Sequence, residues 1–69
     1  MDLELFAERL RGLREKRGLT MVPLAQAIGC ADAAISMWEN AQRVPSGHSI
    51  YKLAQFFGVT VGYLIGLEN

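Results

Sequence analysis

The chain has 69 residues, of which 51% are hydrophobic, and seven Lys or Arg balance seven Asp or Glu to a formal net charge of zero. This length allows one small domain that buries roughly 60% of its unfolded surface, and the hydrophobic content excludes a disordered tail. One cysteine excludes an intramolecular disulfide, and one Cys with one His excludes a structural zinc site. We therefore expect a single domain, 1–69, without metal or cofactor.

The first predicted helix runs from about Leu3 to Arg17 and is expected to end at Gly18. Its apolar residues recur at intervals of three and four, at Leu3, Phe6, Leu10 and Leu13. Residues 9–17 hold five bases and one acid, a local charge of +4. Lys16 and Arg17 lie in the last turn, where positive charge suits the helix dipole, so helix-end electrostatics and phosphate contact are both open for them.

The segment Met21 to Asn40 predicts two short helices joined at Gly29. Thr20 is a suitable N-cap, and Pro23 is tolerated in a first turn, so one helix runs from about Pro23 to Ile28. Gly29 supplies the positive φ for a sharp turn into a second helix, from about Asp32 to Glu39. Small or apolar residues fall where two helices would close on each other, at Leu24, Ala25, Ile28, Cys30, Ile35 and Trp38. This pattern predicts a helix-turn-helix.

Two further helices are predicted after the loop 41–45. Ser46 caps the first, which runs to about Phe57 and stops at Gly58, and Thr60 caps the second, which ends near Ile65. Their expected core residues are Ile50, Leu53, Ala54, Phe57, Val61 and Leu64. The remaining apolar residues are explained by core filling or by a homodimer contact at the last helix: Phe56, Tyr63, Ile65 and Leu67.

Four stretches carry a family resemblance: LREKRGLT at 13–20, LAQAIG at 24–29, AISMWENAQRVPS at 34–46 and LAQFFGVTVGYLIG at 53–66. In this order and spacing they resemble the helix-turn-helix domains of the phage Cro and C1 repressor type, or XRE-like regulators. The resemblance implies an all-α, compact five-helix bundle of the lambda-repressor-like kind. It also implies duplex DNA as the partner, with the helix at 32–39 in the major groove of a two-fold-related site that a homodimer binds.

The resemblance also assigns site residues. The exposed face of the 32–39 helix is expected to contact bases through Asp32, Ala33, Ser36 and Met37. Phosphate contacts are expected from Arg17, Thr20, Met21, Asn40 and Arg43. Met21 stands where relatives commonly have Gln, so only its backbone contact is expected to survive. Arg14 is expected to form an ion pair with Glu39 that fixes the angle between their helices.

Several of these residues have a structural interpretation that stays open. Asp32 suits an N-cap or first turn, Met37 a core gap or a protein interface, and Asn40 a C-cap. Trp38 is expected in the core. No Arg, Gln or Asn lies on the predicted base-contacting face, so specificity would depend on few contacts and on DNA shape.

The predicted function is sequence-specific DNA binding by a transcriptional regulator, acting as a repressor. An enzyme is not expected, because nothing places Asp32, Ser36 and His48 together. No apolar run of membrane-spanning length and no signal peptide occurs, so a cytoplasmic location is expected. The zero net charge, and the lack of any base between Met21 and Asn40, leave an alternative: a protein-interaction module with weak or no DNA binding, using Met21 and Met37.

Overall fold

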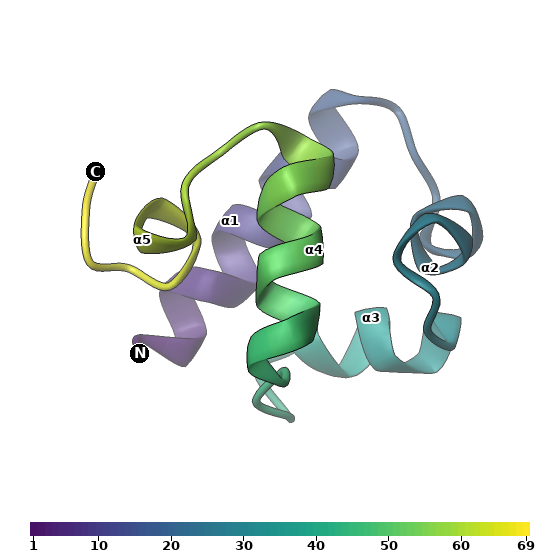
Figure 1. Ribbon diagram of the computed structural model, residues 1–69. Helices are drawn as coiled ribbons and strands as arrows, with labels where there is room; N and C mark the ends of the chain where they lie inside the picture. The colour runs from purple at the N-terminus through teal and green to yellow at the C-terminus, as the bar shows by residue number, and fades with distance from the viewer.

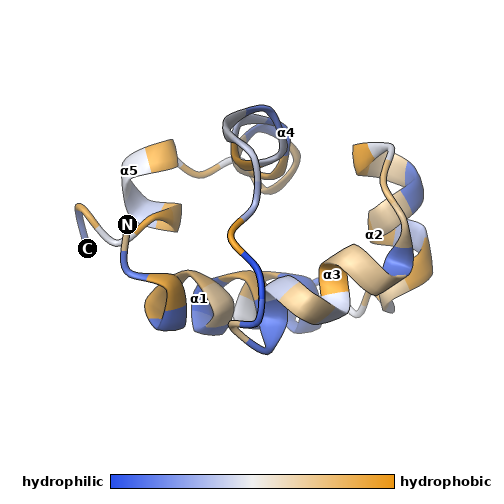
Figure 2. Ribbon diagram, turned by 90° about the horizontal axis from the view of Figure 1, so that it is seen from below, coloured by the Kyte–Doolittle hydropathy of each residue, from blue (hydrophilic) through white to orange (hydrophobic).

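The computed structural model describes residues 1–69 as five α-helices without a strand. These are α1 (Leu3–Lys16), α2 (Met21–Ile28), α3 (Asp32–Glu39), α4 (Gly47–Phe57) and α5 (Val61–Leu64). The predicted all-α, five-helix architecture is confirmed. Helices α1 and α3 lie along one side, α4 crosses the opposite side, and α2 and α5 lie at the two ends (Figures 1 and 2).

The helix-turn-helix geometry follows from the turn at Gly29. This residue has φ +81°, in the left-handed region, and its N–H donates to the Ala25 carbonyl at 2.8 Å. The axes of α2 and α3 bend by 109° across the turn. This angle lies in the range of about 90–120° that helix-turn-helix units use.

Thr20 does not cap α2 as predicted. Helices α1, α4 and α5 are capped by the side chains of Asp2, Ser46 and Thr60, and each of these accepts a hydrogen bond from the backbone N–H of the residue three positions later. Three residues after Thr20 stands Pro23, which has no N–H to donate. Thr20 therefore has extended backbone but no cap hydrogen bond.

Eleven buried residues from all five helices form one core, and all eleven were predicted: Phe6, Leu10, Leu24, Ala25, Ile28, Ile35, Trp38, Leu53, Ala54, Phe57 and Leu64. Val61 was predicted in this core but is 39% exposed. It is the first residue of α5, a single turn whose inward face is taken by Leu64. Cys30 and Ile50 are half-buried against the core's edge.

No single helix is long and apolar enough to cross a membrane. Helices α2 and α3 reach the required length and hydropathy only as a bent pair. The apolar residues responsible, including Leu24, Ile28 and Ile35, are buried in the core.

Candidate nucleic-acid interface

The orientation of α3 is fixed by a buried ion pair with α1. Arg14 Nε and Nη2 donate to the two carboxylate oxygens of Glu39 at 2.6 and 2.9 Å, and Arg14 Nη1 donates to the Leu19 carbonyl at 2.8 Å. The Glu39 side chain is fully buried and that of Arg14 is 13% exposed. Hydrogen bonding to Glu39 raises the pKa of Arg14 against the opposing effect of burial. The structure therefore places this pair where the family resemblance implied it.

A second guanidinium, which the sequence analysis missed, also reaches Glu39. Arg11 Nε lies 3.3 Å from Glu39 Oε1, and Arg11 Nη2 donates to the Glu39 carbonyl at 3.3 Å and to Asn40 Oδ1 at 3.4 Å. Arg11 precedes Arg14 by three residues, so both lie on one face of α1. The three-residue spacing between Arg11 and Arg14 was the signal in the sequence that could have predicted the contact of Arg11 with Glu39. One carboxylate therefore holds two guanidinium groups and leaves the cluster with a surplus positive charge.

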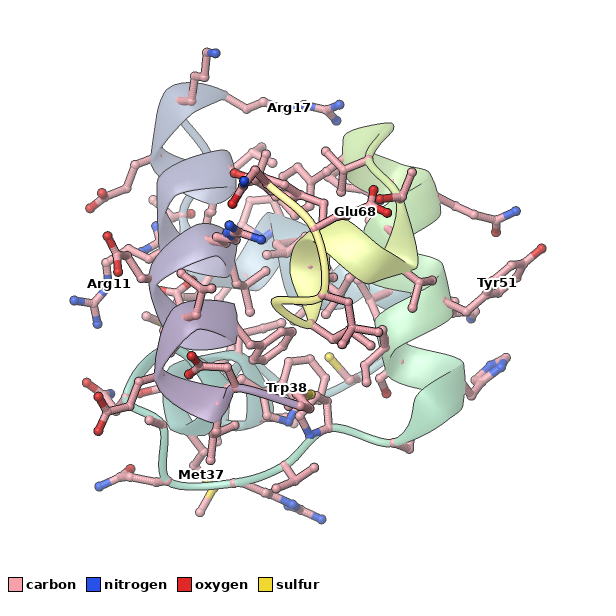
Figure 3. All side chains as sticks on the ribbon, turned by 90° about the vertical axis from the view of Figure 1, so that its left-hand side faces the viewer. Arg11, Arg17, Met37, Trp38, Tyr51 and Glu68 are labelled. Atoms are coloured by element: carbon pink, nitrogen blue, oxygen red, sulfur yellow. The ribbon has the colours of Figure 1, made fainter.

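The outward face of α3 carries the predicted base-contacting residues. Asp32, Ala33 and Met37 are exposed and Ser36 is half-buried. Figure 3 shows Met37 projecting away from the molecule while the neighbouring Trp38 points inward, where it is 4% exposed. Met37 therefore fills no core gap, and Trp38 belongs to the core.

Asn40 combines two features at the end of α3. It is the C-cap residue, and its Nδ2 donates to the Ser36 carbonyl at 2.8 Å and to Ser36 Oγ at 3.4 Å. The C-cap interpretation of Asn40 is thus what the structure shows. Ala41 follows with φ +54°, the left-handed conformation that an alanine rarely adopts.

Most of the cations hold acceptors within the protein. Arg9 donates to the carbonyls of Tyr63 and Glu68 and stacks on the Tyr63 ring at 4.1 Å. Lys52 Nζ donates to the Ile28 carbonyl at 3.2 Å. Arg11, Arg14 and Arg17 also donate to acceptors within the protein. Of the seven bases, only Lys16 and Arg43 form no hydrogen bond in the structure.

Arg17 lies apart from the other predicted phosphate contacts. Its Nη1 donates to the Phe56 carbonyl at 2.8 Å, and its guanidinium carbon lies 5.1 Å from the ring centres of both Phe56 and Phe57. Figure 3 shows the side chain extending from the far end of α1, opposite Met37. No local sequence signal predicts this contact, because it joins residues 39 positions apart.

The remaining phosphate candidates surround α3. Thr20 is exposed with no cap bond, and Met21 begins α2, where the backbone N–H groups of a helix start are free to bind an anion. The Met21 side chain packs against the core, so Met21 and Met37 do not form one exposed surface. Arg43 is exposed in the loop that follows α3.

The face of α1 that carries Arg11 is also acidic. A groove of about 570 Å³ lies between this face and the end of α3, and Glu4, Glu8 and Glu15 line it together with Arg11 and Asn40. These carboxylates would repel phosphates. Arg11 is therefore bordered by acids on one side and by the end of α3 on the other.

Two titratable residues stand outside the surface formed by α3 and its flanks. His48 is exposed in the first turn of α4. Burial raises the pKa of the Cys30 thiol, and the charge of Lys52 opposes the shift in part. A thiol with a raised pKa stays protonated at neutral pH and is a poor nucleophile.

Comparison with known proteins places this geometry among DNA-binding domains. A helix-turn-helix family model matches residues 10–64. The chain is 29% identical to the repressor protein C2 of Salmonella phage P22 over 94% of its own length and 30% of that protein. It is 35% identical to the uncharacterized HTH-type transcriptional regulator YobD of Bacillus subtilis over 94% of its length and 58% of the relative.

A third relative and a solved structure also match the chain. The HTH-type transcriptional repressor RghR of Bacillus subtilis is 48% identical over 77% of this chain and 40% of that protein. The crystal structure of the P22 c2 repressor in complex with a synthetic operator superposes with a TM-score of 0.88, at 28% identity, over 93% of this chain and 97% of that one. The chain thus spans between 30% and 58% of the length of these curated relatives.

Proposed function

Because the chain belongs to the helix-turn-helix family of the Cro/C1 repressor type, we propose that it binds duplex DNA in a sequence-specific manner and regulates transcription as a repressor. The observation that carries this proposal is the orientation of α3. Arg14 and Glu39 fix the helix against α1, and Ile35 and Trp38 are buried beneath it. Its opposite face, with Asp32, Ala33 and Met37 exposed and Ser36 half-buried, can enter a major groove.

Base contacts are proposed from that face. Asp32 can accept from a cytosine amino group, Ala33 and Met37 can touch a thymine methyl, and Ser36 can form a hydrogen bond. No side chain there can form a bidentate contact with a base. Sequence-dependent DNA shape therefore supplies part of the specificity.

Phosphate contacts are proposed from both flanks of α3. Thr20 and the Met21 backbone N–H lie at the start of α2, and Arg43 follows α3; Asn40 is left out because its amide N–H groups are taken by Ser36. Arg17 is omitted because its guanidinium is held by the Phe56 carbonyl. These contacts set the register of the protein on the duplex without reading sequence.

A homodimer on a two-fold-related site and a cytoplasmic, non-enzymatic role complete the proposal. Exposed apolar residues at and after α5 support self-association: Val61 is 39% and Leu67 77% exposed. A dimer would place two copies of α3 in successive major grooves, about 34–36 Å apart.

The test is an acid placed on the proposed contact face. In Ala33→Glu a carboxylate would enter the groove beside phosphates, and we expect at least a tenfold loss of affinity for a duplex selected by the wild type. Gln55→Glu adds the same charge on exposed α4 and should bind within about twofold of the wild type. Fluorescence anisotropy with a labelled duplex measures both. Equal affinity of the two variants would refute docking through α3.

A further inference from the structure

Three polar side chains form a continuous path from α1 to the outward face of α3. Arg11 Nη2 donates to Asn40 Oδ1 at 3.4 Å, and Asn40 Nδ2 donates to Ser36 Oγ at 3.4 Å and to the Ser36 carbonyl at 2.8 Å. Arg11 extends from the outer side of α1, away from the body of the protein (Figure 3). The path therefore joins a residue outside the proposed DNA surface to a hydroxyl on it.

The path has a direction, because a guanidinium can only donate. Two contacts hold the amide of Asn40 in one orientation: the Ser36 carbonyl, which only accepts, takes its nitrogen, and Arg11, which only donates, takes its oxygen. The amide nitrogen of Asn40 must then face α3, where it donates to Ser36. Arg11 itself is held by Glu39 through both its Nε and its Nη2. The buried carboxylate thus anchors the whole arrangement.

The consequence concerns the proton of Ser36. Its oxygen accepts from Asn40, so its single proton is not used in that contact, and Ser36 Oγ donates to no group of the protein. A serine within a helix can otherwise donate to the carbonyl four residues earlier. Here the proton is free to point outward from α3.

We propose, resting on the proposed function, that Arg11 is a positioning residue that acts through Asn40 to present the Ser36 hydroxyl to the major groove as a hydrogen-bond donor. Ser36 then selects a base with an acceptor on its major-groove edge. Guanine offers O6 and N7, adenine N7 and thymine O4, whereas cytosine offers only the N4 amino donor. The protein therefore discriminates against cytosine at the base that Ser36 contacts.

The test is selection and sequencing of duplexes from a random pool, carried out with the wild type and four variants. Ser36→Ala identifies the contacted base pair as the position whose preference falls, by roughly three- to tenfold for one hydrogen bond. Arg11→Met removes one of the two contacts that orient Asn40, so the preference at the same position, and at no other, should weaken. The Arg14–Glu39 pair remains in this variant, and thermal melting checks that it folds.

Asn40→Asp gives the sharpest readout. Both oxygens of an aspartate only accept, so the contact with the Ser36 carbonyl is lost, while one oxygen can still face Arg11 and the other can take the proton of Ser36. Ser36 would then show only lone pairs to the groove, and preference at its position should move to cytosine or to adenine, which carry amino donors. Gln42→Glu, which adds the same charge in the neighbouring exposed loop, should weaken binding without changing any base preference.

The outcomes separate this inference from the function it rests on. If the wild type enriches no site, the proposed function fails. If the wild type enriches a site, but Arg11→Met and Asn40→Asp keep the wild-type preference at the Ser36 position, the positioning role is overturned. A purely structural Arg11 would lower the melting temperature and all affinities together, with every base preference unchanged.

Discussion

Glu39 is the residue on which the placement of α3 depends most. Its buried carboxylate has two partners, and Arg14 is the less exposed of these. Removing one partner of a buried pair costs more than the pair contributes, because the other charge is left uncompensated. Substitution of either arginine is therefore expected to act through Glu39.

Arg14→Ala is predicted to lower the free energy of unfolding by about 3 kcal/mol. Arg11→Ala should lower it by less, because the Arg11 side chain is 46% exposed and its attraction to Glu39 is screened by water. Because hydrogen bonding to Glu39 raises the pKa of Arg14, which is already far above neutral, the guanidinium stays charged in both the folded and the unfolded chain at neutral pH. Urea unfolding at pH 7 measures both losses. An Arg14→Ala variant as stable as the wild type would disprove the role of this pair.

Ala41 is the one non-glycine residue with positive φ. A left-handed alanine costs roughly 1–2 kcal/mol, and glycine gives back part of that gain through its greater entropy in the unfolded chain. Ala41→Gly should therefore stabilise the protein by about 0.5–1 kcal/mol. The same urea titration measures the gain, with Gly12→Ala in α1, where an added Cβ meets nothing within 4 Å, as the control for chain entropy. A less stable Ala41→Gly variant would contradict the strain at this position.

At the scale of the helices, two predicted N-cap residues, Ser46 and Thr20, differ in whether the residue three positions later has an N–H to donate, and this difference is visible in the sequence. Ser46 Oγ accepts from the Ser49 N–H at 3.1 Å, whereas Thr20 faces Pro23 three residues on and caps nothing. Ser46→Ala is therefore predicted to cost about 1 kcal/mol. Thr20→Ala should stay within about 0.5 kcal/mol of the wild type, while still weakening DNA binding if its hydroxyl contacts a phosphate. Thermal melting distinguishes the two, and equal losses would mean that Thr20 caps α2 after all.

Helix positions and core faces could be predicted because they depend on local patterns. Spacings of three and four located the buried faces of α1 and α4, and Gly29 located the sharp turn. The contact of Arg17 could not be predicted, because it depends on how helices distant in sequence meet in space, whereas the contact of Arg11 had one signal in its spacing from Arg14. The exposure of Val61 was not predicted, because α5 is a single helical turn and too short to show a periodicity that would indicate its inward side.

For the whole molecule, the distribution of charge explains how a protein of zero net charge could bind DNA. Five of the seven bases hold acceptors within the fold, and Lys16 and Arg43 remain. Figure 2 shows α2 and α3 as largely apolar, with hydrophilic residues in the loop after α3. Phosphate attraction thus comes from few side chains together with backbone N–H groups, which carry no counted charge.

This distribution predicts a shallow dependence of affinity on salt. Of the two free cations only Arg43 is a proposed phosphate contact, so a dimer neutralises about two phosphates, which gives a slope of log K against log salt near −2. Anisotropy titrations between 50 and 200 mM salt, roughly the range over which counterion release is commonly observed, measure the slope. Arg43→Gln should reduce its magnitude by about two in a dimer. A slope near zero would instead indicate an apolar protein interface.

The most direct test of DNA reading through α3 is selection of duplexes by the wild-type protein from a random pool at low salt, followed by sequencing. We predict enrichment of a palindromic site whose half-sites are centred about 10–10.5 base pairs, or one helical turn, apart. Retention of no duplex, or of duplexes without a shared sequence, would contradict sequence-specific binding by this domain.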